Sequence, residues 1–300
     1  MDCELAVNLK NLLGEGPVWD DRENALFWID GLGQRWFRRD ADGCVAAHET
    51  PSPIGSLVLA QSSGAAYMAL QDGIYGLDTR SGALSFVCNP EAGVIGNRFN
   101  DGKCDPAGRY VVGSMSVDSN DGSAALPAGA LYSVEPGGRW RTLKTGVGIS
   151  NGMAWSSSGG LFYYIDSLAG CVLEHGYCAA TGAIAGGREC VRIPNGEGIP
   201  DGMCIDEEGM LWVAQWGGWR VSRWNPQTGE RISCINVPAS HVTCCAFGGS
   251  GLDELYITTS TVGVQGDELE RQPLAGALFV ARPGVRGTRA FRMGERSDSQ

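Results

Sequence analysis

The 300-residue sequence has no long hydrophobic run and no basic, apolar leader at its start. No stretch approaches the ~20 apolar residues that a membrane-spanning helix requires. The first five residues, MDCEL, lack the positively charged segment and the following apolar segment of a secretory signal. These absences predict a soluble, cytoplasmic protein that does not enter a membrane.

Basic residues and histidines are also scarce. The chain has 23 Lys and Arg residues against 34 Asp and Glu residues, which gives a formal net charge of −11. Nucleic-acid binding is disfavoured, because it depends on cationic contacts to phosphates. The only histidines are His48, His175 and His241, and none has the spacing of zinc ligands.

The eleven cysteines are scattered and show no CxxC spacing. A disulfide framework or a thiolate zinc site would require paired or closely spaced cysteines. The pattern therefore favours reduced thiols in a cytosolic protein.

Glycine and aromatic residues, in contrast, are plentiful: 45 Gly, 9 Trp, 8 Tyr and 8 Phe. This mix suits many short strands joined by tight turns. Glycine and proline interrupt nearly every window in which a helical period would be sought, so few helices are expected. Because large all-β folds commonly reach this length as one unit, residues 1–300 are predicted to form a single all-β domain.

A repeat of 39 to 53 residues organises the chain. Each repeat has an apolar strand, a turn and a second strand that carries an aromatic residue, at positions 28, 67, 110, 163, 212 and 256. A second hairpin follows clearly in four repeats, at 36–43, 74–82, 131–138 and 221–229. Two hairpins make a four-stranded blade, so the repeat predicts a six-bladed β-propeller, closed by an N-terminal strand near residues 3–9.

The innermost strand of each blade lines the central channel, and one position of the repeat faces its mouth. In the six repeats this position holds oxygen-bearing residues: Glu15, Ser56, Asn100, Asn151, Asp201 and Thr243. Each alone is also typical of a turn before a strand. Two carboxylates and two carboxamides at one mouth, however, form a donor set for a hard divalent cation.

Two glycine-containing motifs offer competing interpretations. Residues 148–152, GISNG, fit the G-x-S-x-G nucleophile elbow, with Ser150 as the nucleophile. The elbow needs a strand-to-helix turn, whereas here a strand-like segment and another glycine turn follow, so we disfavour it. Residues 248–251, GGSG, are interpreted as a hairpin turn rather than a phosphate-binding loop, because no helical pattern follows them.

Six segments give the sequence a resemblance to a known family: LGEGP (13–17), NRFNDGK (97–103), ISNG (149–152), FYYIDS (162–167), IPDGM (199–203) and RQP (271–273). Taken in this order, they resemble the family of regucalcin (senescence marker protein), gluconolactonases and related sugar lactonases. The resemblance spans nearly the whole chain.

The resemblance implies a site and a reaction. Glu15, Asn151 and Asp201 would ligate one divalent cation, Ca²⁺ first, with Zn²⁺, Mn²⁺, Mg²⁺ and Fe²⁺ open. Arg98 and Asn100 would contact the substrate, with Asp118 as a further contact. The implied reaction is hydrolysis of a sugar lactone such as gluconolactone to the aldonic acid. As a mechanistic hypothesis, the attacking water is activated by the metal or by Asp201 as the general base.

Two alternatives stay open: a non-enzymatic calcium-binding regulatory propeller, and a paraoxonase-like phosphotriesterase on the same architecture. Trp216 and Trp219 lie in QWGGW (215–219), where relatives carry smaller or different residues. The substituents that the substrate ring carries therefore stay undecided at this stage, as do the native metal and the oligomeric state.

Overall fold

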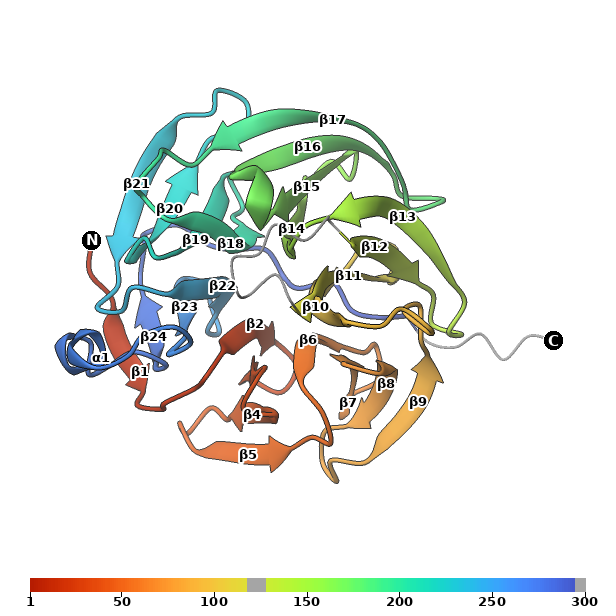
Figure 1. Ribbon diagram of the computed structural model, residues 1–300, viewed down its shortest axis with the longest axis horizontal. Coiled ribbons are helices and arrows are strands. Elements are labelled where there is room, and N and C mark those ends of the chain that lie inside the picture. The colour runs from red at the N-terminus through yellow and green to blue at the C-terminus, as the bar shows by residue number, and fades with distance from the viewer. Residues whose placement is uncertain (118–127, 295–300) are drawn as a thin grey trace.

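The computed structural model describes residues 1–117 and 128–294. Six four-stranded antiparallel sheets are arranged in a ring around a central channel (Figure 1). The prediction of an all-β, six-bladed β-propeller is therefore confirmed. The helical elements that lie wholly within the described residues are the short helix α1 (Asp267–Arg271) and the 3₁₀ turn η2 (Ser167–Ala169). In the described part of the chain, no helix is long and apolar enough to span a membrane.

The blades follow the chain in order. Blade 1 contains β2 (Gly14–Asp20), β3 (Ala25–Asp30), β4 (Arg35–Arg39) and β5 (Val45–Glu49). Blade 2 contains β6 (Ile54–Leu59), β7 (Ala65–Leu70), β8 (Gly73–Asp78) and β9 (Leu84–Cys88). Blade 3 contains β10 (Asn97–Cys104), β11 (Tyr110–Ser116), β12 (Gly129–Val134) and β13 (Trp140–Val147). Blade 4 contains β14 (Ser150–Trp155), β15 (Leu161–Asp166), β16 (Cys171–Cys178) and β17 (Ala183–Arg192). Blade 5 contains β18 (Ile199–Ile205), β19 (Leu211–Trp216), β20 (Arg220–Trp224) and β21 (Arg231–Asn236). Blade 6 contains β22 (Val242–Gly248), β23 (Glu254–Thr259), β24 (Leu278–Ala281) and, from the N-terminus, β1 (Glu4–Val7).

Strand β1 closes the ring. It pairs antiparallel with β24, with Glu4 opposite Val280 and Leu5 opposite Phe279. The first segment of the chain thus completes the last blade, as the sequence predicted for residues 3–9. The pairing also covers an edge of β24 that would otherwise carry unpaired backbone groups.

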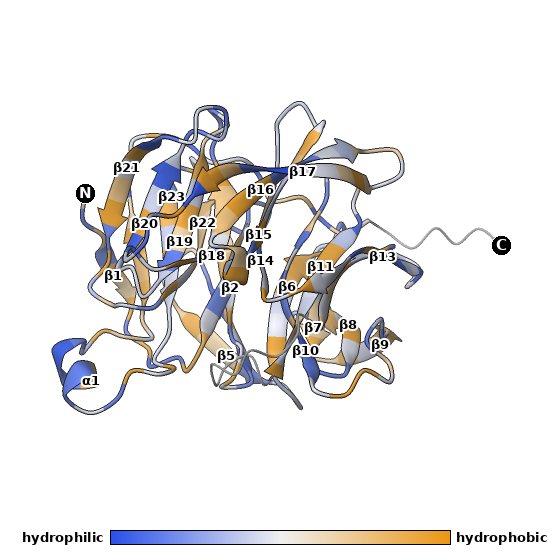
Figure 2. Cartoon of the chain, turned by 45° about the horizontal axis from the view of Figure 1, so that its top comes forward, coloured by the Kyte–Doolittle hydropathy of each residue, from blue (hydrophilic) through white to orange (hydrophobic). Residues whose placement is uncertain are grey.

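The hydrophobic core lies between the blades. Each interface of neighbouring blades holds one cluster of buried side chains; Trp28 and Tyr256, for example, belong to the cluster between blades 1 and 6. Figure 2 shows the apolar residues concentrated along the strands and the polar ones on α1. Because every blade packs against two neighbours, the fold holds the inner strands in fixed positions around the channel.

Every inner strand has an irregularity of register at or next to the repeat position that faces the mouth. The six irregularities lie at 15–18, 54–56, 99–102, 150–153, 200–203 and 242–244. A bulge bends a strand and re-aims the side chain of the extra residue. The oxygen-bearing side chains are therefore presented by the same local device in all six blades.

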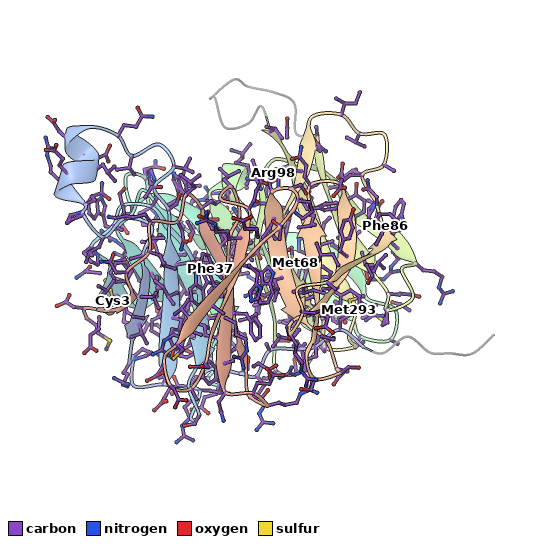
Figure 3. All side chains as sticks on the ribbon, turned by 90° about the horizontal axis from the view of Figure 1, so that it is seen from below. Cys3, Phe37, Met68, Phe86, Arg98 and Met293 are labelled. Carbon is purple, nitrogen blue, oxygen red and sulfur yellow. The ribbon has the colours of Figure 1, made fainter. Side chains whose placement is uncertain are left out.

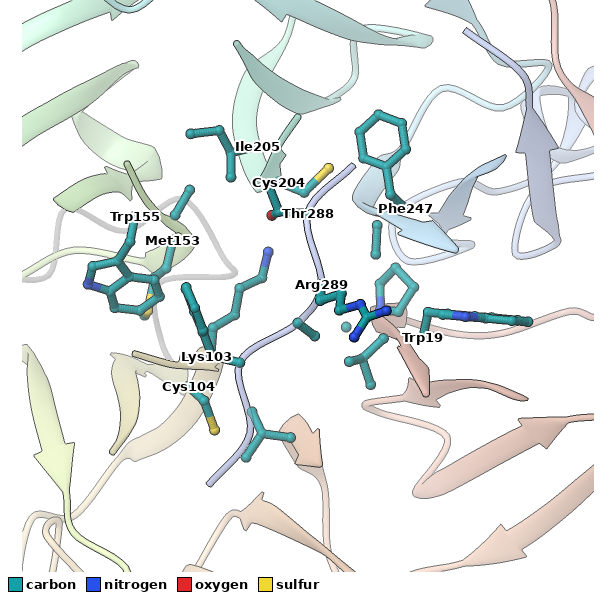
Figure 4. A pocket seen from close by; sticks show the side chains of 18 of the residues that line it. Trp19, Lys103, Cys104, Met153, Trp155, Cys204, Ile205, Phe247, Thr288 and Arg289 are labelled. Carbon is teal, nitrogen blue, oxygen red and sulfur yellow. The ribbon is translucent and has the colours of Figure 1, made fainter. Parts of the chain in front are cut away.

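The C-terminal segment crosses the far end of the channel. Gly287 is bonded to Leu252 and bridges to Asp206, and Met293 is bonded to Leu59. Figure 4 shows residues 288 and 289 of this segment beside a cavity of about 140 Å³ in the lower channel, into which the Lys103 side chain projects. We call residues 286–294 the strap.

Candidate functional site

The predicted site residues lie on inner strands of four blades, at the mouth end of the channel. Glu15 lies on β2, Arg98 and Asn100 on β10, Asn151 on β14 and Asp201 on β18. Figure 3 shows Arg98 near one end of the propeller and Met293 of the strap farther toward the other. The chemistry-bearing residues thus lie at the mouth, away from the strap.

A chain of hydrogen bonds joins blades 3 and 4. Arg98 Nη1 donates to Asn100 Oδ1 at 2.8 Å and to the Phe99 carbonyl at 3.0 Å. Asn100 Nδ2 in turn donates to Asn151 Oδ1 at 3.1 Å and to the Ser150 carbonyl at 2.8 Å. Hydrogen bonds therefore connect the two residues with predicted substrate roles to a predicted metal ligand.

Ser167 fixes the orientation of the Asn151 amide. Its hydroxyl donates to the Pro200 carbonyl at 2.6 Å and so accepts the bond from Asn151 Nδ2 at 2.8 Å. This arrangement settles which end of the amide is nitrogen and turns Oδ1 toward Asn100. Because Pro200 precedes Asp201, the same bond also ties blade 4 to the strand that carries Asp201.

Three carboxylates share the neighbourhood. Asp101 and Asp201 are 4% and 6% exposed, and Glu15 is partly buried. Burial raises the pKa of Glu15, and the Asp101 carboxylate raises it further. Burial likewise raises the pKa of Asp201 well above its usual value, with Glu15 and Asp101 adding to the rise.

Arg98 and Lys103 only partly offset this negative charge. Burial lowers the pKa of Arg98, whereas the nearby carboxylates of Glu15 and Asp201 oppose that change. Lys103 is bonded to the Met203 carbonyl and lowers the pKa of Asp101 against the larger effect of burial. Three carboxylates facing two cationic side chains leave the site short of positive charge.

These residues fit a hard divalent cation. Asp101 Oδ2 is buried without a hydrogen-bond partner among the described residues, and the crowded carboxylates repel one another. Within that same part of the chain, no group of three His, Cys, Asp or Glu side chains is arranged to hold a metal ion. The oxygens that would hold a cation at the mouth are the amide oxygen of Asn151 and the carboxylates of Glu15 and Asp201.

Two of the residues at the repeat position that faces the mouth, Ser56 and Thr243, have structural roles. The Ser56 hydroxyl lies 2.6 Å from the Tyr110 hydroxyl, and Thr243 Oγ1 donates to the Gly14 carbonyl at 2.5 Å. Both side chains thus join neighbouring blades. Asp118, the third predicted substrate contact, lies outside the described residues.

Ser150 does not have the surroundings of a nucleophile elbow. It begins strand β14, its hydroxyl accepts a bond from the Tyr164 hydroxyl at 2.9 Å, and it is fully buried. A Cβ placed on Gly113 would lie only 1.7 Å from Ser150 Oγ, so the hydroxyl is packed against the neighbouring blade. The structure agrees with setting the elbow aside.

Sequence reasoning missed two residues of this network. Asp101 follows Asn100 directly, and its place in the segment NRFNDGK was the available signal. Ser167 lies in η2, outside the repeat position that was compared among blades. Its place at the end of the segment FYYIDS was the available signal, whereas its link to Asn151 had no signature in the spacing.

Residues 13–261 match the family described as SMP-30/Gluconolactonase/LRE-like region. The chain belongs to this family. Regucalcin of Gallus gallus is 39% identical over 277 residues, which cover 92% of each chain. YvrE of Bacillus subtilis, named as a sugar lactone lactonase, is 35% identical over 282 residues, covering 94% of this chain and 95% of that protein.

A solved structure of another family member has the same fold. The calcium-binding protein regucalcin of Agrobacterium tumefaciens superposes with a TM-score of 0.91 at 26% identity, covering 98% of this chain and 97% of that one. The resemblance inferred from the six segments is therefore confirmed. Members of the SMP-30/gluconolactonase family thus include proteins named for calcium binding and proteins named for lactone hydrolysis.

Proposed function

We propose that this protein hydrolyses a sugar lactone, such as gluconolactone, to the aldonic acid with the help of one divalent cation. The observation that carries the proposal is the bond from Asn100 to Asn151, because it joins a polar substrate clamp to the metal-ligand set. The relative named as a sugar lactone lactonase and the family as a whole support the reaction class.

Glu15, Asn151 and Asp201 are the proposed metal ligands. Their donors are all oxygens, which favours Ca²⁺ over softer metals, with Zn²⁺, Mn²⁺, Mg²⁺ and Fe²⁺ as candidates for the same position. A bound cation would supply the positive charge that polarises a lactone carbonyl.

Arg98 and Asn100 are the proposed substrate clamp. Arg98 Nη1 is occupied by Asn100 and the Phe99 carbonyl, but its buried Nε has no hydrogen-bond partner among the described residues. An unpartnered buried N–H is a costly group, which is expected at a functional site rather than in a packed core. The clamp would hold the sugar hydroxyls so that the ring carbonyl faces the ligand set.

Asp201 is the proposed general base. Its carboxylate can take a proton from an attacking water, which the amides of Asn100 and Asn151 cannot do. Asp201 lies on β18 at the register irregularity between Pro200 and Met203, and we expect its carboxylate to point toward the mouth. Asp201 would then both hold the cation and accept the proton.

A calcium-binding regulatory role is the second candidate, favoured by the relatives named regucalcin. A calcium buffer, however, has no need of a buried guanidinium whose Nε lacks a partner in the described structure. A paraoxonase-like phosphotriesterase would use the same architecture, and no specific contact favours it.

A panel of aldonolactones and aryl phosphotriesters, each assayed with Ca²⁺, Mn²⁺, Mg²⁺, Zn²⁺ and Fe²⁺, separates these functions. Cation-dependent turnover of at least one aldonolactone, with little turnover of the phosphotriesters, supports the proposal. Tight calcium binding without turnover of any substrate supports the regulatory alternative instead.

A further inference from the structure

Exposed aliphatic side chains border the candidate site on blades 4 and 5. Leu168 is 61% exposed and Ile199 is 47% exposed. Both are close in sequence to a proposed metal ligand or its support: Leu168 follows Ser167, and Ile199 precedes Asp201 by two residues. Apolar side chains exposed singly need no explanation, but apolar side chains that gather beside a polar site can mark a binding surface.

Leu168 is held beside the inner strands of blades 4 and 5 by its short 3₁₀ turn. The turn η2 is capped by Asp166, whose side chain accepts from the Leu168 backbone N–H, and it packs against β18. A Cβ on Gly148 would come within 2.6 Å of Leu168 Cδ1, so the side chain lies across Gly148. This contact places it beside the start of β14, the strand that carries Asn151.

Ile199 continues the apolar surface toward blade 6. It lies opposite Trp216 in the pairing of β18 with β19, so the two side chains are on the same face of the sheet. The Trp216 ring stacks on His241, with centroids 4.1 Å apart and planes 10° apart. Leu168, Ile199, Trp216 and His241 together form what we call the apolar arc.

The structure assigns the apolar arc to an apolar substituent of the substrate, and we propose that the natural substrate is a lactone whose ring carries an alkyl or aryl group. This inference rests on the proposed lactone hydrolysis. The polar clamp of blade 3 would hold the ring oxygens, while the substituent would extend over the arc beside Asn151 and Asp201.

The composition of the arc decides between an apolar substituent and a second sugar. A further sugar ring needs hydrogen-bond partners along with an aromatic face. Leu168 and Ile199 offer none, and Nδ1 of His241 is buried where the imidazole ring stacks on Trp216. Burying aliphatic and aromatic surface against an alkyl or aryl group, in contrast, is favourable in proportion to its area. Of the two tryptophans in QWGGW, Trp216 thus contributes a flat aromatic wall to this surface.

The test compares D-glucono-1,5-lactone with its 6-O-pentyl and 6-O-benzyl ethers. The wild-type protein should show a kcat/KM for the ethers about tenfold or more above that for the parent lactone. Ile199→Ser should lower the ratio of ether to parent kcat/KM about tenfold, and Trp216→Ala should lower it at least as far. Ile232→Ser is the matched control, because Ile232 is an equally exposed isoleucine, at 48%, on the outer strand of the same blade.

Three outcomes overturn the inference. One is a wild-type protein that does not prefer the ethers, and another is an Ile199→Ser variant that lowers both substrates equally. The third is a dimer, seen by light scattering, that Ile199→Ser converts to monomers without changing the substrate ratio, since the arc would then be an interface between copies. If the parent lactone is hydrolysed in any of these cases, the proposed function still holds. If no lactone is hydrolysed, both the proposed function and the preference for an apolar substituent are wrong.

Discussion

The side-chain amide of Asn100 donates a hydrogen bond to Oδ1 of Asn151 across the gap between blades 3 and 4, over 3.1 Å. Asn151 in turn is anchored at its nitrogen by Ser167. One amide oxygen is thus held between a proposed substrate contact and a proposed cation. The residues that orient this oxygen should therefore affect cation binding as the ligands themselves do.

Ser167→Ala should weaken calcium binding about tenfold, because the Asn151 amide loses the bond that fixes its orientation. Isothermal titration calorimetry on the purified variant measures the change. Ser133→Ala is the control, since Ser133 is a buried serine whose hydroxyl has no hydrogen-bond partner among the described residues. Equal calcium affinity in the two variants would show that Ser167 does not position Asn151.

Asp201→Asn and Arg98→Ala should fail in different ways. Asp201→Asn keeps an oxygen donor but removes a charge and the proposed base, so kcat should fall about a hundredfold or more and cation affinity should weaken. Arg98→Ala leaves the ligand set in place, so kcat/KM should fall about tenfold to a hundredfold with cation affinity nearly unchanged. Steady-state kinetics over a cation titration separates the two, and a normal kcat for Asp201→Asn at saturating cation would leave Asp201 as a ligand only.

Ser150→Ala should keep most of the hydrolytic activity. The substitution leaves the buried Tyr164 hydroxyl without its acceptor, so the free energy of unfolding should fall by about 1–2 kcal/mol. Activity and urea denaturation measured on the same preparation distinguish a structural role from a catalytic one. Complete loss of turnover with calcium affinity retained would revive Ser150 as a nucleophile.

Arg292→Gln should destabilise the strap at neutral pH by about 2 kcal/mol. Arg292 donates to Asp20 at 2.7 Å and to Asp21 at 2.6 Å. Burial alone would raise the pKa of Asp20, but the bonds from Arg292 and from the Arg22 backbone N–H lower it below 3.8.

The pH dependence of this effect follows from the direction of the shift. A carboxylate whose pKa is lower in the folded state stabilises the protein above the unfolded pKa, and this contribution is lost as the pH falls through the folded pKa. The difference in urea midpoint between wild type and Arg292→Gln should therefore be full at pH 7 and shrink below about pH 4. Arg289→Gln, in the same strap but with a side chain 78% exposed, should change stability little at either pH.

The fold could be predicted because each blade repeats the same strand and turn pattern. The register of that pattern also brought Glu15, Asn100, Asn151 and Asp201 to equivalent places, since the inner strands of a propeller share one geometry. Ser56 and Thr243 satisfy the same pattern, yet their hydroxyls bond to neighbouring blades. A repeat position therefore gives the direction of a side chain but not its partner.

The rest depends on contacts between segments that no repeat relates. Ser167 reaches Asn151 from the turn after β15, and its own partner, the Pro200 carbonyl, lies 33 residues away. The strap crosses the channel through backbone hydrogen bonds to blades 2, 3, 5 and 6 and through Arg292 to blade 1, and its sequence shows no strand period. Such long-range contacts are fixed by packing in three dimensions, which spacing along the chain does not encode.

Cation-dependent hydrolysis is measured as the rate of acid release from D-glucono-1,5-lactone by chelator-treated protein as Ca²⁺ is added back. Before any cation is added, we expect the rate to equal that of the protein-free solution. Added Ca²⁺ should restore the rate up to a saturating value, and Mg²⁺ or another divalent cation should restore it to a different saturating value. A full rate in the chelator-treated protein, unchanged by any added cation, would contradict it.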